Sequence, residues 1–148
     1  MKRMHIHLTV TDLSAGVAFY AGLFAHPPTV LKDDYAKWML DDPCVNFAIS
    51  THGASPGLNH LGIQVESEEE SAVLGARLAQ LAAPVVAEGV GACCYAQSEK
   101  SWVFDPEGVP WEAFRTMGEA RVFADEARAD RPCCVPTAVP MPARFKAC

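Results

Sequence analysis

Two cysteines stand side by side in the stretch GACCYAQSEKSW, at positions 93 and 94. Consecutive Cα atoms are about 3.8 Å apart across a trans peptide, whereas bridged cysteines prefer roughly 4.4–6.8 Å. A disulfide between Cys93 and Cys94 is therefore disfavoured. We expect a reduced pair that binds a soft metal or metalloid, with burial as small apolar residues as the alternative.

Two similar halves of the chain supply the elements that must position this pair. HIHLTV and NHLGIQV alternate apolar and polar residues and predict strands. A helix is expected after each strand, capped by Asp12 in the first half and by the Ser67–Glu70 capping box in the second. Short β-like segments follow, so the predicted order is βαβββ, twice. The expected apolar stripes of the helices are Leu13, Val17, Tyr20 and Phe24, then Leu74, Leu78 and Leu81.

Aligning His5 with His60 brings the two halves into register, and the last strand of each half then pairs Asn46 with Glu112. The second half carries 11 more residues than the first between these positions, and the cysteine pair lies in that interval. We therefore expect the pair on or beside an elaborated loop, where functional groups are often displayed.

This pattern resembles the vicinal oxygen chelate superfamily, whose members include glyoxalase I, fosfomycin resistance enzymes and extradiol dioxygenases. The resemblance covers about residues 4–117. It implies an α+β fold in which two paired βαβββ modules, about 1–55 and 56–118, form a metal-binding cup. Metal ligands in such cups come from the first and last strand of each module.

The resemblance implies a metal site with His5, His60 and Glu112 as ligands and catalytic residues. Two imidazoles and one carboxylate leave three octahedral positions open, which lets Fe(II) bind both a substrate and dioxygen. Asn46 stands where glyoxalase I has a carboxylate, so it is expected to leave a position open. His7 shares a strand face with His5 and is an accessory candidate. Other histidines are expected to be structural, namely His26 and His52.

The segment ACCYAQSEKSWVFDPEGVPWEAF, with LNHLGIQV before it, is similar to the organoarsenical carbon–arsenic lyases and the related cadmium-induced proteins. Those lyases are Fe(II)-dependent dioxygenases that cleave trivalent organoarsenicals such as methylarsenite to inorganic arsenite. The resemblance implies that Cys93 and Cys94 bind the arsenical. Members commonly have Gln at the first ligand position, so His5 is a departure.

A trivalent monoalkyl arsenical suits a thiol pair, because two thiolates can replace its two hydroxyls and leave the carbon–arsenic bond exposed. Lys100 is an accessory candidate that would favour the thiolate form if it lies near the pair. A non-enzymatic cadmium- or arsenite-binding resistance protein would need only the cysteines. A fosfomycin-resistance enzyme would need a basic cluster that the sequence lacks, and a glyoxalase-type enzyme is disfavoured by Asn46.

Length, composition and net charge limit the expected domain size, partners and location. The chain has 148 residues, half of them apolar, which is enough for one domain at 1–118. Its net charge of -6 argues against nucleic acid or an anionic membrane as a partner. The N-terminus does not read as a signal peptide and no apolar run approaches about 18 residues, so a cytoplasmic protein, monomer or homodimer, is expected.

The tail at 119–148 is rich in proline and contains Cys133 and Cys134. Four prolines argue against a long helix or a central strand in this segment. Two interpretations stay open for it. It is either a flexible extension or a second soft-metal site that captures substrate.

Overall fold

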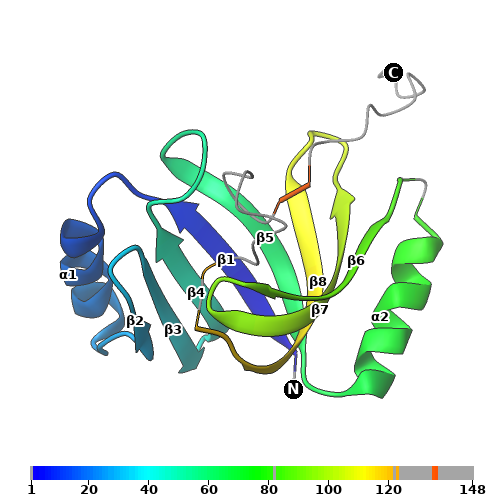
Figure 1. Ribbon diagram of the computed structural model, residues 1–148, viewed down its shortest axis with the longest axis horizontal. Coiled ribbons are helices and arrows are strands. Elements are labelled where there is room, and N and C mark those ends of the chain that lie inside the picture. The colour runs from blue at the N-terminus through cyan, green and yellow to red at the C-terminus, as the bar shows by residue number, and fades with distance from the viewer. Residues whose placement is uncertain (1, 82, 122, 124–134, 137–148) are drawn as a thin grey trace.

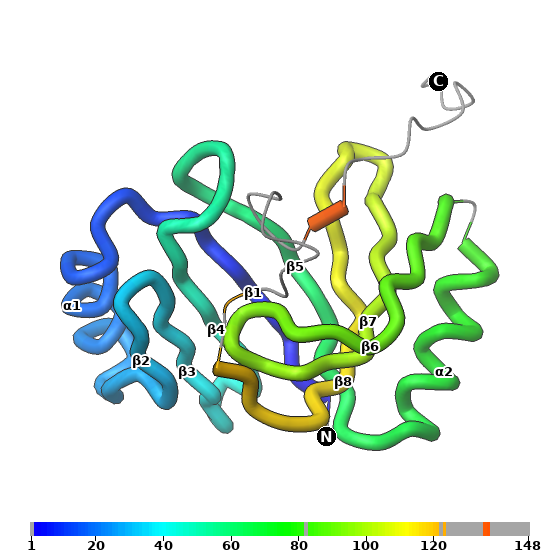
Figure 2. Tube along the Cα trace, viewed as in Figure 1, coloured from blue at the N-terminus to red at the C-terminus, as the bar shows by residue number. Residues whose placement is uncertain are grey.

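The computed structural model describes residues 2–81, 83–121, 123 and 135–136. Its centre is one mixed sheet of eight strands that curls into a half-barrel, in the order β2-β3-β4-β1-β5-β8-β7-β6 (Figures 1 and 2). The elements are β1 (Arg3–Thr9), α1 (Leu13–Phe24), β2 (Val30–Leu31), β3 (Tyr35–Asp41), β4 (Cys44–Ser50), β5 (Gly57–Val65), α2 (Glu68–Ala79), β6 (Val86–Cys93), β7 (Ala96–Phe104) and β8 (Pro110–Glu119).

The predicted repeat of βαβββ is confirmed, and the fold is α+β. In the first module β1 pairs in parallel with β4, and in the second β5 pairs in parallel with β8. The modules meet where β1 and β5 pair antiparallel at the centre of the sheet. The two modules therefore form one continuous sheet within a single chain.

The first helix covers one face of the sheet and fixes which side chains point the other way. The Asp12 side chain accepts a hydrogen bond from the Ala15 amide and caps α1. The predicted stripe of α1 packs against a buried cluster that includes Trp38 and Phe47, and Tyr20 lies 4.5 Å from Phe47 between ring centroids. Because strand side chains alternate between faces, the histidines of β1 lie on the opposite, inner face.

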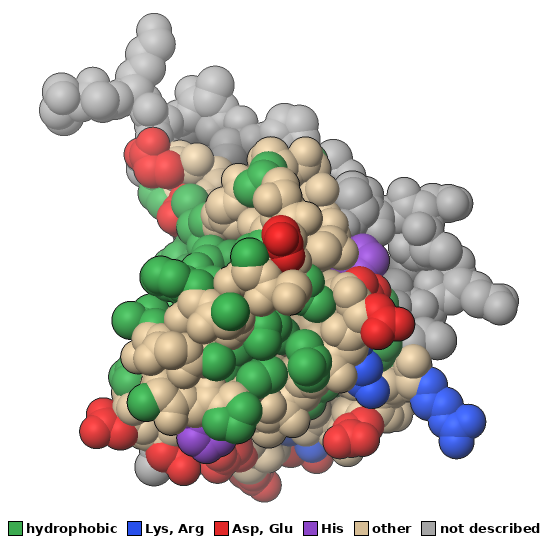
Figure 3. Space-filling view, turned by 90° about the vertical axis from the view of Figure 1, so that its left-hand side faces the viewer, with side chains coloured by type: hydrophobic (Ala, Val, Ile, Leu, Met, Phe, Trp, Pro, Cys, Tyr) green, Lys and Arg blue, Asp and Glu red, His purple; other side chains and the backbone are tan. Residues whose placement is uncertain are grey.

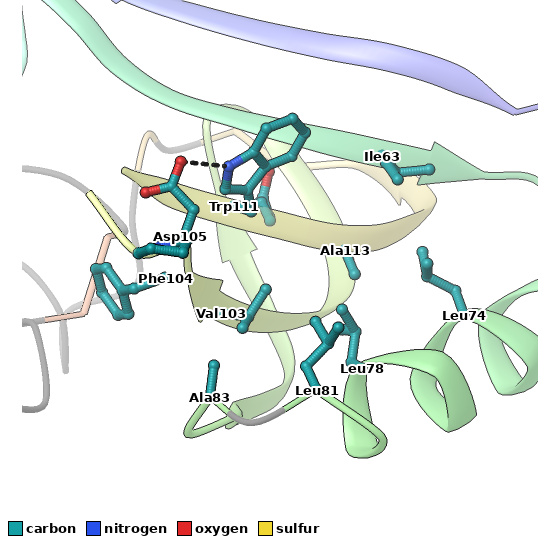
Figure 4. Close-up of a pocket in the computed structure, with 12 residues that line it drawn as sticks. Ile63, Leu74, Leu78, Leu81, Ala83, Val103, Phe104, Asp105, Trp111 and Ala113 are labelled. Carbon is teal, nitrogen blue, oxygen red and sulfur yellow. Dashed lines mark hydrogen bonds between the residues drawn. The ribbon is translucent and has the colours of Figure 1, made fainter. Parts of the chain in front are cut away.

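The second helix follows the same plan at the other end of the sheet. Ser67 caps α2 by accepting from the Glu70 amide, and Leu74 and Leu78 are buried against the sheet. Leu81 was expected to extend this stripe, but α2 ends at Ala79 and Leu81 is 51% exposed. A cavity of about 370 Å³ lies between the helix and the sheet, lined almost entirely by apolar side chains (Figure 4).

Hydrophobic side chains also reach the outer surface at the end of the molecule that carries α1 (Figure 3). Phe19 and Leu23 on this helix are 63% and 64% exposed. Neither helix in the described ranges has the length and apolar character needed to cross a bilayer.

Candidate functional site

The inner face of the sheet carries a group of buried polar residues. His5 and His7 come from β1, His60 from β5 and Glu112 from β8. All four are at most 5% exposed. Buried ionisable groups are rare unless they are paired or bind a metal, so their concentration on one face marks a candidate site.

Three ligand atoms converge in this group. His5 Nε2 lies 3.2 Å from His60 Nε2, and Glu112 Oε2 lies 3.6 Å from His60 Nε2 and 3.9 Å from His5 Nε2. Ligands at about 2.1 Å from one metal and at right angles are about 3.0 Å apart. The three atoms are therefore close to the spacing that a single ion requires.

Hydrogen bonds hold both imidazoles with Nε2 directed at this centre. His5 Nδ1 lies 2.9 Å from the carbonyl oxygen of Asn46, and His60 Nδ1 lies 2.7 Å from Asn59 Oδ1. A ring nitrogen that donates to such an oxygen leaves the other nitrogen with its lone pair available. Asn59 was not recognised from the sequence, although it directly precedes His60 and shares its motif.

His7 lies beside these ligands and forms an overlapping set with them. The candidate ligand atoms of His5, His7 and His60 all lie within 4.8 Å of one another. His7 Nε2 is 2.9 Å from Ser50 Oγ, while His7 Nδ1 is buried and has no hydrogen-bond partner among the described residues. His7 can therefore serve as a further ligand or as a contact for a bound molecule.

Burial favours the neutral forms of His5 and His7, and neutral imidazole is the form that binds metal. Burial, together with neighbouring His60, lowers the pKa of His5 to about 4. Burial also lowers the pKa of His7 well below its ordinary value. For Glu112, burial opposes ionisation, but the charge of Lys100 and the bond with His60 outweigh it and hold the pKa well below its ordinary value.

Lys100 contacts a candidate ligand directly. Its ammonium lies 2.6 Å from Glu112 Oε1, and both side chains are buried. Burial works to lower the pKa of Lys100, but the facing charge of Glu112, and then that of Cys94, outweigh it and raise the pKa. The expected influence of Lys100 on the thiol pair is therefore electrostatic, while its hydrogen bond positions Glu112.

Gly62 gives the strands room to bring these groups together. It pairs with His5 on one side and with Glu112 on the other. A Cβ atom at Gly62 would stand 2.6 Å from the carbonyl oxygen of Glu112. No side chain fits at this position, a requirement that the sequence pattern did not reveal.

Asn46 on β4 pairs with His5 on β1. Its side-chain amide donates to Gln64 Oε1 at 2.9 Å. The Asn46 Oδ1 atom is buried and accepts no hydrogen bond within the described part of the chain. A neutral amide side chain thus lies beside His5 at this register position.

The cysteine pair lies at the tip of a long hairpin. Cys93 ends β6, and Cys94 and Tyr95 form the two-residue turn into β7. Most of the extra residues of the second module therefore lengthen this hairpin rather than add an irregular loop, since β6 and β7 have 8 and 9 residues where β2 and β3 have 2 and 7. Both turn residues have left-handed φ values, 55° and 60°, which cost non-glycine residues about 1–3 kcal/mol each.

The two sulfur atoms are close enough for one atom to bridge them, with Cys93 Sγ 3.2 Å from Cys94 Sγ. Cys93 is disulfide-bonded, so the expectation of a reduced pair is wrong for this residue. Binding of a ligand by both sulfurs therefore requires reduction first. Cys133 and Cys134 lie outside the described residues, so the two interpretations of the tail, a flexible extension and a second soft-metal site, both stay open.

Trp102 connects the cysteine pair to the histidines. Its ring is fully buried, packs with Cys93, and lies 5.1 Å from the His60 ring between centroids. Trp102 also pairs with Glu112 in the register of β7 and β8. The cysteine pair and the histidine group therefore share one buried region, and Trp102 is a site residue that sequence reasoning missed.

A second set of contacts clamps the turn to the first module. The Tyr95 hydroxyl donates to Asp34 Oδ1 at 2.6 Å, and His52 Nε2 lies 2.7 Å from Asp34 Oδ2. Phe123 stacks on His52 at 3.8 Å between ring centroids, and its carbonyl oxygen accepts from the Cys94 amide at 2.6 Å. His52, for which a structural role was expected, takes part in these contacts. They hold the turn of the β6–β7 hairpin, whose course Figure 2 shows, to the first module.

Comparison with known proteins identifies relatives over most of the chain. The "Trivalent organoarsenical cleaving enzyme" of Bacillus sp. (strain MD1) is 37% identical over 139 residues, which is 91% of this chain and 84% of that protein. The protein of the same name from Thermomonospora curvata is 33% identical, over 92% of this chain and 90% of that protein. "Cadmium-induced protein CadI" of Mycobacterium tuberculosis (strain ATCC 25618 / H37Rv) is 32% identical, covering 86% and 85%. No family model matches the chain.

Solved structures share the fold at low sequence identity. An extradiol ring-cleaving dioxygenase from B. fuscum aligns with a TM-score of 0.59 at 19% identity, over 80% of this chain and 34% of that one. The Mn(II)-bound glyoxalase from Novosphingobium aromaticivorans aligns with a TM-score of 0.58 at 18% identity, over 84% and 44%. The predicted fold class is confirmed by these neighbours, and the chain belongs to the family of trivalent organoarsenical cleaving enzymes and CadI proteins.

Proposed function

We propose that this protein is an Fe(II)-dependent dioxygenase that cleaves the carbon–arsenic bond of trivalent organoarsenicals such as methylarsenite and releases inorganic arsenite. One observation carries the proposal. A soft-ligand pair, Cys93 and Cys94, shares a buried region with a convergent two-histidine, one-carboxylate group, and Trp102 contacts both. A protein that only sequesters arsenic would not need the second group.

The residues fit the proposed metal. Two imidazole nitrogens, His5 Nε2 and His60 Nε2, and one carboxylate oxygen, Glu112 Oε2, lie at near-coordination spacing. When bound there, Fe(II) would supply the redox chemistry that lets dioxygen react with an organic group. The bond from Lys100 to Oε1 leaves Oε2 of the carboxylate to serve as a single-oxygen ligand.

The chain's own residues provide binding and orientation. Once reduced, Cys93 and Cys94 can exchange for the two hydroxyls of a monoalkyl arsenical and hold arsenic in one place. The contacts of Tyr95 fix the position of the turn, and the buried Trp102 ring packs against Cys93 and lies beside His60. Such positioning matters because a displacement of about 1 Å can cost on the order of 100-fold in rate.

The decisive experiment incubates the reduced protein with Fe(II), dioxygen and methylarsenite. Atom balance requires CH₃As(OH)₂ and O₂ to yield As(OH)₃ and HCHO, because arsenic stays trivalent and carbon takes up the oxidation. We expect arsenite and formaldehyde in equal amounts, with one O₂ consumed for each. Methylarsenite recovered unchanged with iron bound and thiols reduced would contradict the proposal.

A second candidate function is non-enzymatic binding of cadmium or arsenite, and the similarity to CadI favours it. Binding of this kind needs the cysteine sulfur atoms but not His5 or Glu112. Resistance in cells that survives replacement of Glu112 but not of Cys94 would support this candidate. We place either activity in the cytoplasm, because a reducing compartment keeps a vicinal pair reduced.

A further inference from the structure

A second cavity, of about 460 Å³, opens beside Cys94 between the two modules. The first module contributes Thr29 to Lys32 and Lys37, and the second contributes the turn at Cys94 and Tyr95 and the end of β8. A molecule attached to the Cys94 sulfur therefore has a space for its other substituent. The charged side chains that line this space are Lys32, Lys37 and Glu119.

Lys37 is the least solvated of these charges. It lies on β3 opposite Ala48, is half-buried, and forms no ion pair within 4.0 Å among the residues that the structure describes. Burial lowers the pKa of Lys37, while the charges of Cys94 and Glu119 oppose that effect. A cation withdrawn from water without a paired carboxylate gains most from a ligand that brings a negative charge.

Tyr95 gives the cavity an aromatic wall. The bond from its hydroxyl to Asp34 fixes the ring, and Lys32 Nζ lies 5.5 Å from the ring centroid. A flat aromatic group can lie against such a ring at low entropic cost. The cavity thus combines an aromatic surface with two cations and one carboxylate.

Building on the proposed function, we propose that this cavity binds the organic substituent of the arsenical and selects aromatic substituents that carry an acidic group, with Lys37 as the specificity-determining residue. The arsenic atom stays on the sulfur atoms, and the acidic group meets Lys37. Methyl and unsubstituted phenyl groups occupy the same space without that contact. A hydrogen bond between charged partners contributes enough for a preference of about tenfold or more.

A simpler role for Lys37 makes a different prediction. If Lys37 only stabilises the thiolate of Cys94, its replacement weakens binding of every arsenical by the same factor. If Lys37 binds the substituent, its replacement weakens the binding only of arsenicals that carry a negative group. The chemistry of the probe therefore separates the two roles.

The test measures dissociation constants on the reduced full-length protein under argon without iron, from quenching of tryptophan fluorescence. The probes are methylarsenite, phenylarsenite, and phenylarsenite with a para carboxylate or a para aminomethyl group. We expect wild type to bind the carboxylated probe about tenfold more tightly than phenylarsenite. Lys37→Met should abolish this preference and change phenylarsenite binding by less than about twofold, while Lys37→Glu should favour the aminomethyl probe.

Lys2→Met is the matched control, because it removes the same charge from an exposed position outside the cavity. It should leave the preference intact. Equal weakening of all four probes in Lys37→Met, or a carboxylate preference that survives it, would overturn the inference. Because the measurement needs neither iron nor turnover, a protein that shows the preference but cleaves nothing would refute the proposed function alone.

Discussion

Lys100 Nζ lies 2.6 Å from Glu112 Oε1, so one oxygen of this carboxylate is committed to a buried ammonium while the other faces His5 and His60. A carboxylate held in this way cannot rotate freely and offers a single oxygen to a metal. The ion pair also compensates a charge that would otherwise be buried alone. Lys100 therefore influences both the stability of the protein and the charge available to the metal.

Replacing Lys100 by Met should destabilise the metal-free protein by about 3 kcal/mol, because Glu112 is left buried without its partner. A divalent cation then supplies the missing charge, so the thermal shift on adding metal should exceed that of wild type. Scanning calorimetry with and without Fe(II) under argon measures both effects. Glu99→Gln, which breaks the partly exposed pair with Arg115, should cost less than about 1 kcal/mol and leave the metal-dependent shift unchanged.

Glu112→Gln should lose iron binding but keep arsenical binding, and Cys94→Ser should show the reverse. The glutamine keeps an acceptor for Lys100 but loses the anionic oxygen, so iron binding should weaken and turnover should fall about 100-fold or more, with arsenical binding retained. The serine should retain iron and lose tight arsenical binding, because oxygen is a poor ligand for soft arsenic. Bound iron by elemental analysis and arsenical affinity by fluorescence report the two properties separately. Normal turnover by Glu112→Gln would show that the metal assignment is wrong.

Asn46→Glu should place a carboxylate where the structure has a neutral amide. If a vacant coordination position is needed for the reaction, this variant should still bind metal but lose about 100-fold or more in cleavage rate. Asn46→Gln has nearly the same length without the charge and should keep a larger share of activity. Comparing oxygen uptake of the two variants with iron fully loaded tests this role. Equal activities would mean that the charge at this position is unimportant.

Gly62→Ala should push β5 away from β8, because the new methyl group would meet the backbone of Glu112. Backbone cannot move aside as a flexible side chain can, so we expect a loss of about 1–3 kcal/mol in stability and weaker metal binding. Gly75→Ala on α2 adds the same methyl group in open space and should stabilise the protein by about 0.5–1 kcal/mol. Urea unfolding curves of the two variants should therefore shift in opposite directions.

Tyr95→Phe should release the turn that carries Cys94. The hydroxyl bond to Asp34 offsets part of the strain of the left-handed turn, so its loss should weaken arsenical binding by about fivefold and leave metal binding unchanged. Tyr20→Phe on α1, far from the clamp, is the matched control and should bind arsenicals as wild type does. Unaltered affinity in Tyr95→Phe would mean that Phe123 and the strands suffice to hold the turn.

The clamp also predicts a pH window for the stability difference between wild type and Tyr95→Phe. Partial burial and the bond to Asp34 raise the pKa of Tyr95 to about 12, so its contribution is complete below 10.0 and is lost as pH rises through about 12. Bonds from Tyr95 and His52 outweigh burial and lower the pKa of Asp34, so its contribution is complete above 3.8 and is lost as pH falls further. Unfolding measurements should give a constant difference between about pH 5 and pH 9.

The fold could be predicted from the sequence because its signals are local. Alternation in β1 and β5, and the caps at Asp12 and Ser67, fix the type and start of each element. The repeat then aligned His5 with His60, and the structure places them 3.2 Å apart between Nε2 atoms. The repeat in the sequence therefore predicted which two histidines lie close together.

The remaining site residues could not be recognised because their roles depend on register across the sheet. Gly62 matters only because it pairs with both His5 and Glu112. Trp102 reads as an ordinary core residue until β7 places its ring between Cys93 and His60. Asp34 lies in a loop, and its partners His52 and Tyr95 are far away in sequence.

The two halves of the chain meet at a seam, where β1 pairs antiparallel with β5, and the candidate metal site takes residues from both halves. His5 belongs to the first half, whereas His60 and Glu112 belong to the second. A metal held by all three would act as a staple across the seam, and at 100 times its dissociation constant it would add about 2.7 kcal/mol to folding stability. If that metal is the proposed iron, iron supply would affect both how much of the protein stays folded and how fast it works.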